Sequence, residues 1–327
     1  MAIRFGAFAV QLAGATDEEL GVSTVAITGA WSYSGRPVAA RLLQAGHTVV
    51  SLTNREIPDP DPHDGRVRAE PYDFSPGALE RAVDGVEVLA CAYWTRHDRA
   101  PLGHRGPWLS HAEAVSRSGR IIEAAGAAGV SRLVWTSIAN PGLDPDLSYY
   151  AGKAEVERLV RESGLPHAIL RPVCFFGPDA ILIENVAWAA RRLPLLPIPA
   201  GPEYWIRPIH VDDYAELVAD AVASTATFTR DACGPDRVEF GELIRTIARL
   251  SGGKARPVRL PVSACAPLYA VASRVMRETI LTKDELIGLS RNRLDSLEPP
   301  AGPTSLLAWL EEHVAEVGLR FAREPSR

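Results

Sequence analysis

The chain has 327 residues, of which 46% are hydrophobic and 23% charged, and its formal net charge is −5. This composition fits one large globular domain or two coupled ones, and the lack of a basic excess argues against nucleic acid or an anionic membrane as partner. No apolar run reaches the ~18 residues of a membrane span. The cysteines show neither zinc nor disulfide spacing, so we expect a cytoplasmic protein with reduced thiols and no metal; they are Cys91, Cys174, Cys233 and Cys265.

Residues 1–22 precede the first predicted strand, and we expect them to form a disordered extension. One arginine and a short apolar stretch give them a weak likeness to a secretion signal. A buried strand begins directly behind them, at about Thr24, which favours the extension. Translation from Val22 on an alternative start codon would open the chain with "MSTVAITGA".

Short apolar runs alternate with helical stretches through the first half of the chain. The expected strands are 24–28, 47–53, 66–74, 86–94, 131–137 and 167–172, and the expected helices are 36–46, 76–85, 111–129 and 149–164. Such alternation predicts an α/β fold, a Rossmann doubly wound parallel sheet covered on both faces. Its ligand should lie at the carboxyl ends of the strands, between the first and the fourth.

This rhythm ends after about Pro172. The segment 193–205 is rich in proline, and helices are expected at 211–224, 240–252, 262–276 and 305–322. We place a Rossmann domain at residues 23–173 and a smaller, mostly helical substrate lobe at 174–327. The proline-rich stretch 58–65 is expected to be a surface loop.

The turn after the first strand, "TGAWSYSGR", has the pattern of a phosphate-binding turn. Its first and third glycine positions are Gly29 and Gly35, and Ser32 replaces the second. Ser32 is small, and its hydroxyl can donate to a phosphate oxygen. Backbone N–H groups at the start of the helix point at the anion. We therefore predict an NAD(P)-binding turn, with contacts from Tyr33, Ser34 and Arg36 as well.

The end of the second strand, "SLTNRE", carries no carboxylate where NAD enzymes place one for the ribose hydroxyls. Asn54 is neutral, and Arg55 and Arg36 are cationic. This pattern favours NADP(H), with NAD(H) as the other option, unless Arg55 is simply a solvated loop residue. Asp73, which ends the third strand, is placed to meet the adenine amine.

Tyr149 and Lys153 lie at positions i and i+4, so both project from one helix face. A neighbouring ammonium favours the phenolate form of a tyrosine and so suits it to acid–base work near neutral pH. Ser137, at the tip of the fifth strand, can orient a substrate oxygen. Such Tyr–Lys pairs are common on surface helices. The position beside the expected nicotinamide favours a catalytic role here.

The blocks "TGAWSYSG", "VWTS", "YYAGK", "ILRPVCFFGP" and "RPIHVDDYA" together resemble the short-chain dehydrogenase/reductase superfamily over about residues 24–220. The resemblance is greatest to its atypical members, the NmrA-like proteins and the Rossmann-type accessory subunit of mitochondrial complex I. It implies a catalytic set of Ser137, Tyr149 and Lys153, with Lys153 on the nicotinamide ribose. Ser32 and the short gap from Ser137 to Tyr149 depart from the extended sugar-nucleotide enzymes.

The loop after the sixth strand matches the family's substrate-pocket loop. We place Pro172 with the cofactor contacts and Phe176, Arg207 and His210 with the substrate contacts. A structural histidine bonded to backbone is the competing interpretation of His210. The expected pocket is largely apolar with one or two cations at its rim.

The sequence thus predicts an NAD(P)-dependent oxidoreductase that reduces or oxidises a small, largely apolar carbonyl or hydroxyl compound. Two alternatives stay open. One is a non-catalytic NAD(P)H-binding sensor or assembly protein, and the other is an epimerase or dehydratase with tightly bound NAD(P). The expected partner is a small-molecule substrate, and the long helices could form a homodimer face.

Overall fold

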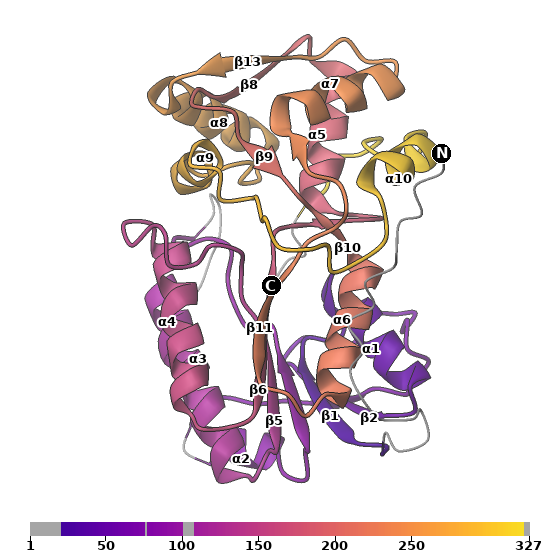
Figure 1. Ribbon diagram of the computed structural model, residues 1–327, viewed down its shortest axis with the longest axis vertical. Coiled ribbons are helices and arrows are strands. Elements are labelled where there is room, and N and C mark those ends of the chain that lie inside the picture. Colours follow the sequence, from indigo (N-terminus) through magenta and orange to yellow (C-terminus); the bar gives the residue numbers. More distant parts are fainter. Residues whose placement is uncertain (1–20, 76, 101–107, 324–327) are drawn as a thin grey trace, which may run out of the picture.

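The computed structural model describes residues 21–75, 77–100 and 108–323. Its centre is a sheet of seven parallel strands in the order β11-β6-β5-β4-β1-β2-β3 (Figure 1). This order confirms the predicted doubly wound Rossmann sheet, with the switch point between the first and fourth strands. The strands are β1 (Thr24–Thr28), β2 (Thr48–Leu52), β3 (Arg68–Glu70), β4 (Val88–Cys91), β5 (Arg132–Thr136), β6 (His167–Pro172) and β11 (Phe228–Ala232).

Each face of the sheet is buried under helices because alternate residues of the apolar strands point to opposite sides. One face packs on α1 (Gly35–Gln44) and α6 (Val211–Ala223), and the other on α2 (Ala78–Ala82), α3 (His111–Ala127) and α4 (Ser148–Glu162) (Figure 1). In β1, for example, Val25 and Ile27 join the first core and Ala26 joins the second.

The second half of the chain builds a smaller lobe beyond the carboxyl edge of the sheet. Its core gathers apolar side chains from helices and from three two-stranded sheets, β7–β10, β8–β13 and β9–β12. These elements are β7 (Phe175–Phe176), α5 (Ile181–Arg192), β8 (Leu195–Pro199), β9 (Trp205–Ile206), β10 (Ile209–His210), β12 (Val238–Glu239), α7 (Phe240–Leu250), β13 (Arg256–Leu260), α8 (Val262–Met276), α9 (Lys283–Ser290) and α10 (Leu306–His313).

The division at residue 173 needs one correction, because two elements of the second half return to the sheet. Helix α6 packs against α1 through the first core, and β11 pairs with β6 as the seventh parallel strand. The sequence hid this return, since β11 reads "FTRDA" and only its last two residues are buried. An edge strand covered on one side does not need a continuous apolar run.

The remaining expectations concern the cysteines, membrane spans, metal sites and the N-terminal extension. All four cysteines are free thiols, as expected. Over the described ranges, no helix is long and apolar enough to cross a membrane, and no three His, Cys, Asp or Glu side chains gather as a metal site would need. The expected extension lies outside these ranges, apart from residues 21 and 22.

Candidate active site

The turn at residues 29–36 joins β1 to α1 as a tight bend that requires its glycines. Gly29 has a φ of +76°, a left-handed conformation that favours glycine. A Cβ on Gly35 would overlap the Gly29 carbonyl oxygen. The Ser32 N–H donates to the same oxygen over 2.9 Å, which closes the bend. Ser32 therefore fills the second glycine position without opening the turn.

This turn has hydrogen-bonding capacity left for an anion. The Ser32 hydroxyl accepts from the Gly35 N–H over 3.1 Å and keeps its own proton to donate. In the part of the chain that the structure describes, the N–H groups of Tyr33 and Ser34 have no acceptor. Both precede the N-terminus of α1, whose dipole favours negative charge. These groups fit the pyrophosphate of a dinucleotide.

Tyr33 connects the turn to the smaller lobe. Its ring packs on Phe175 with a centroid distance of 6.2 Å, and burial raises the pKa of its hydroxyl well above the ordinary value. The hydroxyl is buried, and no described residue forms a hydrogen bond with it. The predicted cofactor contact of Tyr33 therefore concerns its backbone N–H, and its ring serves the contact between the lobes.

The loop at residues 58–65, expected only at the surface, folds over the turn. The Trp31 indole N–H donates to Asp61 over 2.8 Å, and His63 Nε2 lies 3.1 Å from the Ala30 carbonyl oxygen. The Asp61 carboxylate also accepts from the N–H groups of His63 and Gly65. This contact could not be predicted from the sequence, because a carboxylate that caps a loop looks like any solvated aspartate.

The expected adenosine end lies beside the turn, since β1 and β2 are neighbours in the sheet and Thr28 pairs with Leu52. Asn54 is used structurally, because its amide bonds both the N–H and the carbonyl of Tyr72. Arg36 and Arg55 are exposed, and neither forms an ion pair within the described ranges. Two unneutralised guanidinium groups therefore flank this edge.

Asp73 is exposed and lies beyond the end of β3 at Glu70. Its carboxylate accepts from the N–H and the hydroxyl of Ser75, and these bonds hold its pKa below the ordinary value. One carboxylate oxygen carries both bonds, so the other remains available. The predicted contact of Asp73 with adenine stays a prediction.

Helix α4 brings Tyr149 and Lys153 to the same aromatic side chain, Trp94, from the loop after β4. The Lys153 ammonium lies 4.7 Å from the centre of the Trp94 indole, and the Tyr149 ring meets it edge-on at 5.9 Å. Gly152 makes room, because a Cβ there would lie 2.8 Å from the indole. The indole N–H is buried, and it has no hydrogen-bond partner within the described part of the chain.

Lys153 is buried, with 4% of its surface exposed, and its ammonium donates to the Thr136 carbonyl over 3.1 Å. Burial lowers the pKa of Lys153 to about 7. Glu157, one turn further along α4, opposes this lowering. The lysine can therefore change its protonation state near neutral pH.

Ser137 follows Thr136 at the tip of β5 and is also buried. Its hydroxyl is buried and has no hydrogen-bond partner among the described residues. Nearby, the Glu157 carboxylate binds Arg171 through two hydrogen bonds of 2.7 and 2.6 Å. Burial alone would raise the pKa of Glu157, but Arg171 and Arg161 hold it below the ordinary value. Ser137 and Lys153 thus share a buried charged neighbour that sequence reasoning missed.

His111 is a second neighbour that the sequence did not single out. Its ring stacks on Trp94 at 5.6 Å and meets the Tyr149 ring edge-on at 5.4 Å. Its Nδ1 lies 2.8 Å from the Ser148 hydroxyl. Burial lowers the pKa of His111, which favours the neutral ring. The spacing of Tyr149 and Lys153 could not reveal it, because His111 comes from another helix.

The three residues predicted to contact substrate serve the fold in this structure. Phe176 is fully buried in the core of the smaller lobe. His210 caps α6, since its Nδ1 accepts from the Asp212 N–H over 3.3 Å. Arg207 is buried, and its guanidinium donates to the carbonyls of Gly234, Ser296 and Glu298. A substrate would find little free polar surface on any of them.

Pro172 ends β6 at the carboxyl edge of the sheet, as expected for a cofactor neighbour. It is buried, and its carbonyl accepts from the Ala139 N–H over 3.2 Å. The structure thus brings the turn and the Tyr149–Lys153 pair to one edge of the sheet and leaves the predicted substrate residues in the lobe beyond.

Comparison with known proteins decides the family. A family model described as NAD(P)H-binding matches residues 29–183. A ceramide reductase from Caulobacter vibrioides is 30% identical over 241 residues, which cover 72% of this chain and 73% of that protein. The chain belongs to the atypical short-chain dehydrogenase/reductases. Residues 29–183 match an NAD(P)H-binding domain, and the resemblance inferred from the sequence blocks is confirmed.

Other atypical short-chain dehydrogenase/reductases are more distant. The 40 kDa subunit of the mitochondrial NADH-ubiquinone oxidoreductase of Neurospora crassa is 24% identical over 280 residues, covering 82% of this chain and 70% of the subunit. An NADPH-dependent quinone oxidoreductase from Escherichia coli, solved with NADPH, has a TM-score of 0.72 at 21% identity, covering 89% of this chain and 100% of that chain. This structure shows the shared fold.

One relative is much longer than this chain. An uncharacterized protein of Mycobacterium tuberculosis is 25% identical over 264 residues, which are 80% of this chain but only 27% of that protein. This chain therefore spans about a quarter of the length of the mycobacterial proteins that it matches.

Proposed function

We propose that the protein is an NADP(H)-preferring oxidoreductase that transfers a hydride between the nicotinamide and an apolar carbonyl or hydroxyl compound. The observation that carries the proposal is the convergence of Tyr149 and Lys153 on Trp94, at the sheet edge that also holds the turn 29–36. Its relatives include a ceramide reductase, so the substrate class extends to carbonyls with long alkyl chains.

NADPH supplies the hydride in this proposal, and the chain's own residues supply the proton and the positioning. Tyr149 gives its phenolic proton to the carbonyl oxygen during reduction and recovers one afterwards. Lys153 stabilises the resulting phenolate, and its pKa of about 7 lets it pass a proton to Tyr149 at neutral pH. We assign Ser137 to orienting the substrate oxygen, since it follows the residue whose carbonyl binds Lys153.

The test of this chemistry is Tyr149→Phe, assayed with NADPH against aromatic aldehydes, quinones and long-chain ketones. We expect turnover to fall at least about 100-fold, because acid–base catalysis by one group contributes roughly 10²–10⁴. The dissociation constant for NADPH should not change.

Tyr150→Phe is the matched control. Tyr150 is buried on the neighbouring position of α4 with its hydroxyl against Gly288, so its loss should leave turnover intact. Equal turnover in Tyr149→Phe and the unaltered protein would overturn the mechanism.

A second candidate function is NAD(P)H binding without turnover. The burial of Lys153 beneath Trp94 favours it, because a lysine bonded to a backbone carbonyl can be a purely structural cation. This candidate expects tight NADPH binding and no reduction of any compound in the panel. Turnover that depends on Tyr149 would exclude it.

A further inference from the structure

Helix α8 is an apolar helix with an unusual amount of free surface. Only Cys265 of its fifteen residues is buried. Leu268, Val271 and Val275 are 50%, 64% and 76% exposed, and their spacing of i, i+3 and i+7 puts them on one face. Helices of globular proteins normally bury such a face, and contiguous exposed apolar surface marks an interaction site.

The neighbouring strand β8 and the residue before it carry two more exposed apolar side chains. Leu195, its first residue, is 56% exposed, and Leu193 just before it is 43% exposed. Helix α8 packs beside β8, where the Tyr269 hydroxyl donates to the Pro197 carbonyl over 2.8 Å. Five of the eleven large hydrophobic side chains exposed in the described residues therefore come from this one region. We call Leu193, Leu195, Leu268, Val271 and Val275 the α8 face.

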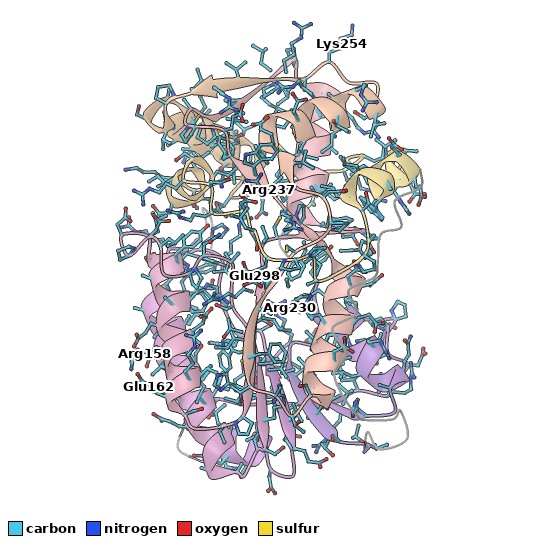
Figure 2. The ribbon with its side chains drawn as sticks, viewed as in Figure 1. Arg158, Glu162, Arg230, Arg237, Lys254 and Glu298 are labelled. Atoms are coloured by element: carbon cyan, nitrogen blue, oxygen red, sulfur yellow. The ribbon has the colours of Figure 1, made fainter. Side chains whose placement is uncertain are left out.

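The same segment is basic. Residues 254–277 contain five lysines and arginines and no aspartate or glutamate, so the segment carries +5 within a chain of −5. All five are exposed, and Lys254 extends from the end of the lobe in Figure 2. Arg259 pairs with Glu239 over 2.8 Å. Within the described ranges, no acidic group pairs with the others, which are Lys254, Arg256, Arg274 and Arg277.

The apolar and basic side chains lie beside each other. Strands β8 and β13 pair in register, so Leu195 faces Arg256 directly across the ladder. On α8, Arg274 lies between the positions of Val271 and Val275. Unpaired cations among exposed aliphatic side chains complement a surface that carries negative charge on the outside and is apolar underneath.

We propose that the α8 face docks on an anionic lipid bilayer. Its aliphatic side chains enter the boundary between headgroups and acyl chains, and the cations meet lipid phosphates. A second copy of the chain is a poorer occupant, because a symmetric contact would bring the same unpaired cations opposite each other. The net charge of the whole chain argued against a membrane, but it averages over this basic region.

The α8 face is connected to the candidate site by contacts that Arg96 makes with α9 and with the segment before it. Helix α9 follows α8, and its Glu285 binds Arg96 over 2.6 Å, on the loop that also carries Trp94. Arg96 donates as well to the Ile280 carbonyl, between α8 and α9. Figure 1 shows both helices in the smaller lobe, beyond one end of α4. Docking would therefore bring this end of the site close to the bilayer.

The experiment is flotation of the full chain with lipid vesicles, without nucleotide or substrate, so that its failure says nothing about the reductase chemistry. The vesicles are phosphatidylcholine alone, or with about one third phosphatidylglycerol. We expect binding to the anionic vesicles that weakens in high salt, and at least about tenfold weaker binding to the neutral ones.

Two variants locate the contact. Val271→Asn with Val275→Asn, and separately Arg256→Gln with Arg274→Gln, should each weaken binding to anionic vesicles about tenfold. Leu297→Asn is the control, since Leu297 is 84% exposed outside the α8 face and its loss should change nothing. Unchanged melting temperatures show that the variants fold.

Three results would overturn the proposal. They are no binding to anionic vesicles by the unaltered protein, binding by both double variants that equals that of the unaltered protein, and a shift of oligomeric state in lipid-free solution when Val271 and Val275 are changed. The last result would assign the face to a second copy of the chain.

Discussion

At the scale of single residues, the choice between NADP(H) and NAD(H) depends on Arg36 and Arg55. Both are exposed without an ion-pair partner among the described residues, beside a neutral Asn54 that is tied to Tyr72. We predict that Arg36→Gln with Arg55→Gln raises the Kd for NADPH at least about tenfold, as expected for a lost charge-assisted hydrogen bond, and changes that for NADH little. Calorimetric titration measures both. Equal losses for the two nucleotides would contradict a phosphate-reading role, and Arg68→Gln on β3 is the control.

Lys153 gives a second prediction at this scale. Burial lowers its pKa from the ordinary 10.5 to about 7, so the unfolded chain holds the extra proton between these two values. Burying the charged ammonium destabilises the folded state. This destabilisation is therefore greatest below pH 7, and it disappears as the pH rises toward 10.5. Lys153→Met should raise the melting temperature at pH 6 and lose this advantage by about pH 10. A pH-independent effect, or one equal to that of Lys254→Met, would contradict the burial argument.

At the scale of elements, the turn 29–36 and α1 form one unit that tolerates no side chain at its third glycine. We predict that Gly35→Ala costs at least about 2 kcal/mol of unfolding free energy and abolishes NADPH binding, because its Cβ would overlap the Gly29 carbonyl oxygen. Gly126→Ala in α3 is the control, since its Cβ would meet open space and alanine favours a helix. Denaturant unfolding and NADPH titration report the two effects. A stable Gly35→Ala variant that binds NADPH normally would refute the tight-turn account.

At the scale of the whole molecule, the sequence pattern predicted the strands, helices and residue pairs that depend on neighbouring positions in the chain. The first six strands and the helices between them follow from buried apolar runs and glycine stops, and the sheet order follows from the handedness of the crossovers. The pair Tyr149 and Lys153 was visible because i and i+4 share a face. Trp94 and His111 were not, because only the sheet brings a β4 loop and the start of α3 to α4. Glu157 lies on α4 with Lys153, but its pairing with Arg171 of β6 depends on the packing of α4 on the sheet.

Features that depend on packing between distant parts of the chain could not be predicted from the sequence. Nothing in the pattern of α6 distinguishes a helix that covers the sheet from one in the smaller lobe, since it is apolar around much of its circumference. The β11 segment offered no strand signal, because "FTRDA" has no continuous apolar run. Arg207 and His210 look like site residues in sequence, and only the structure shows that their hydrogen bonds go to backbone.

The central claim is that the nicotinamide lies beside Tyr149 and Lys153, and a crystal structure with bound NADPH tests it most directly. We expect the pyrophosphate oxygens to accept hydrogen bonds from the N–H groups of Tyr33 and Ser34. We also expect the reacting nicotinamide carbon to lie close enough to the Tyr149 hydroxyl for a substrate carbonyl to fit between them, with its carbon and oxygen each about 3–3.5 Å from the group it reacts with. A nicotinamide ring on the other side of Trp94, away from Tyr149 and Lys153, would contradict it.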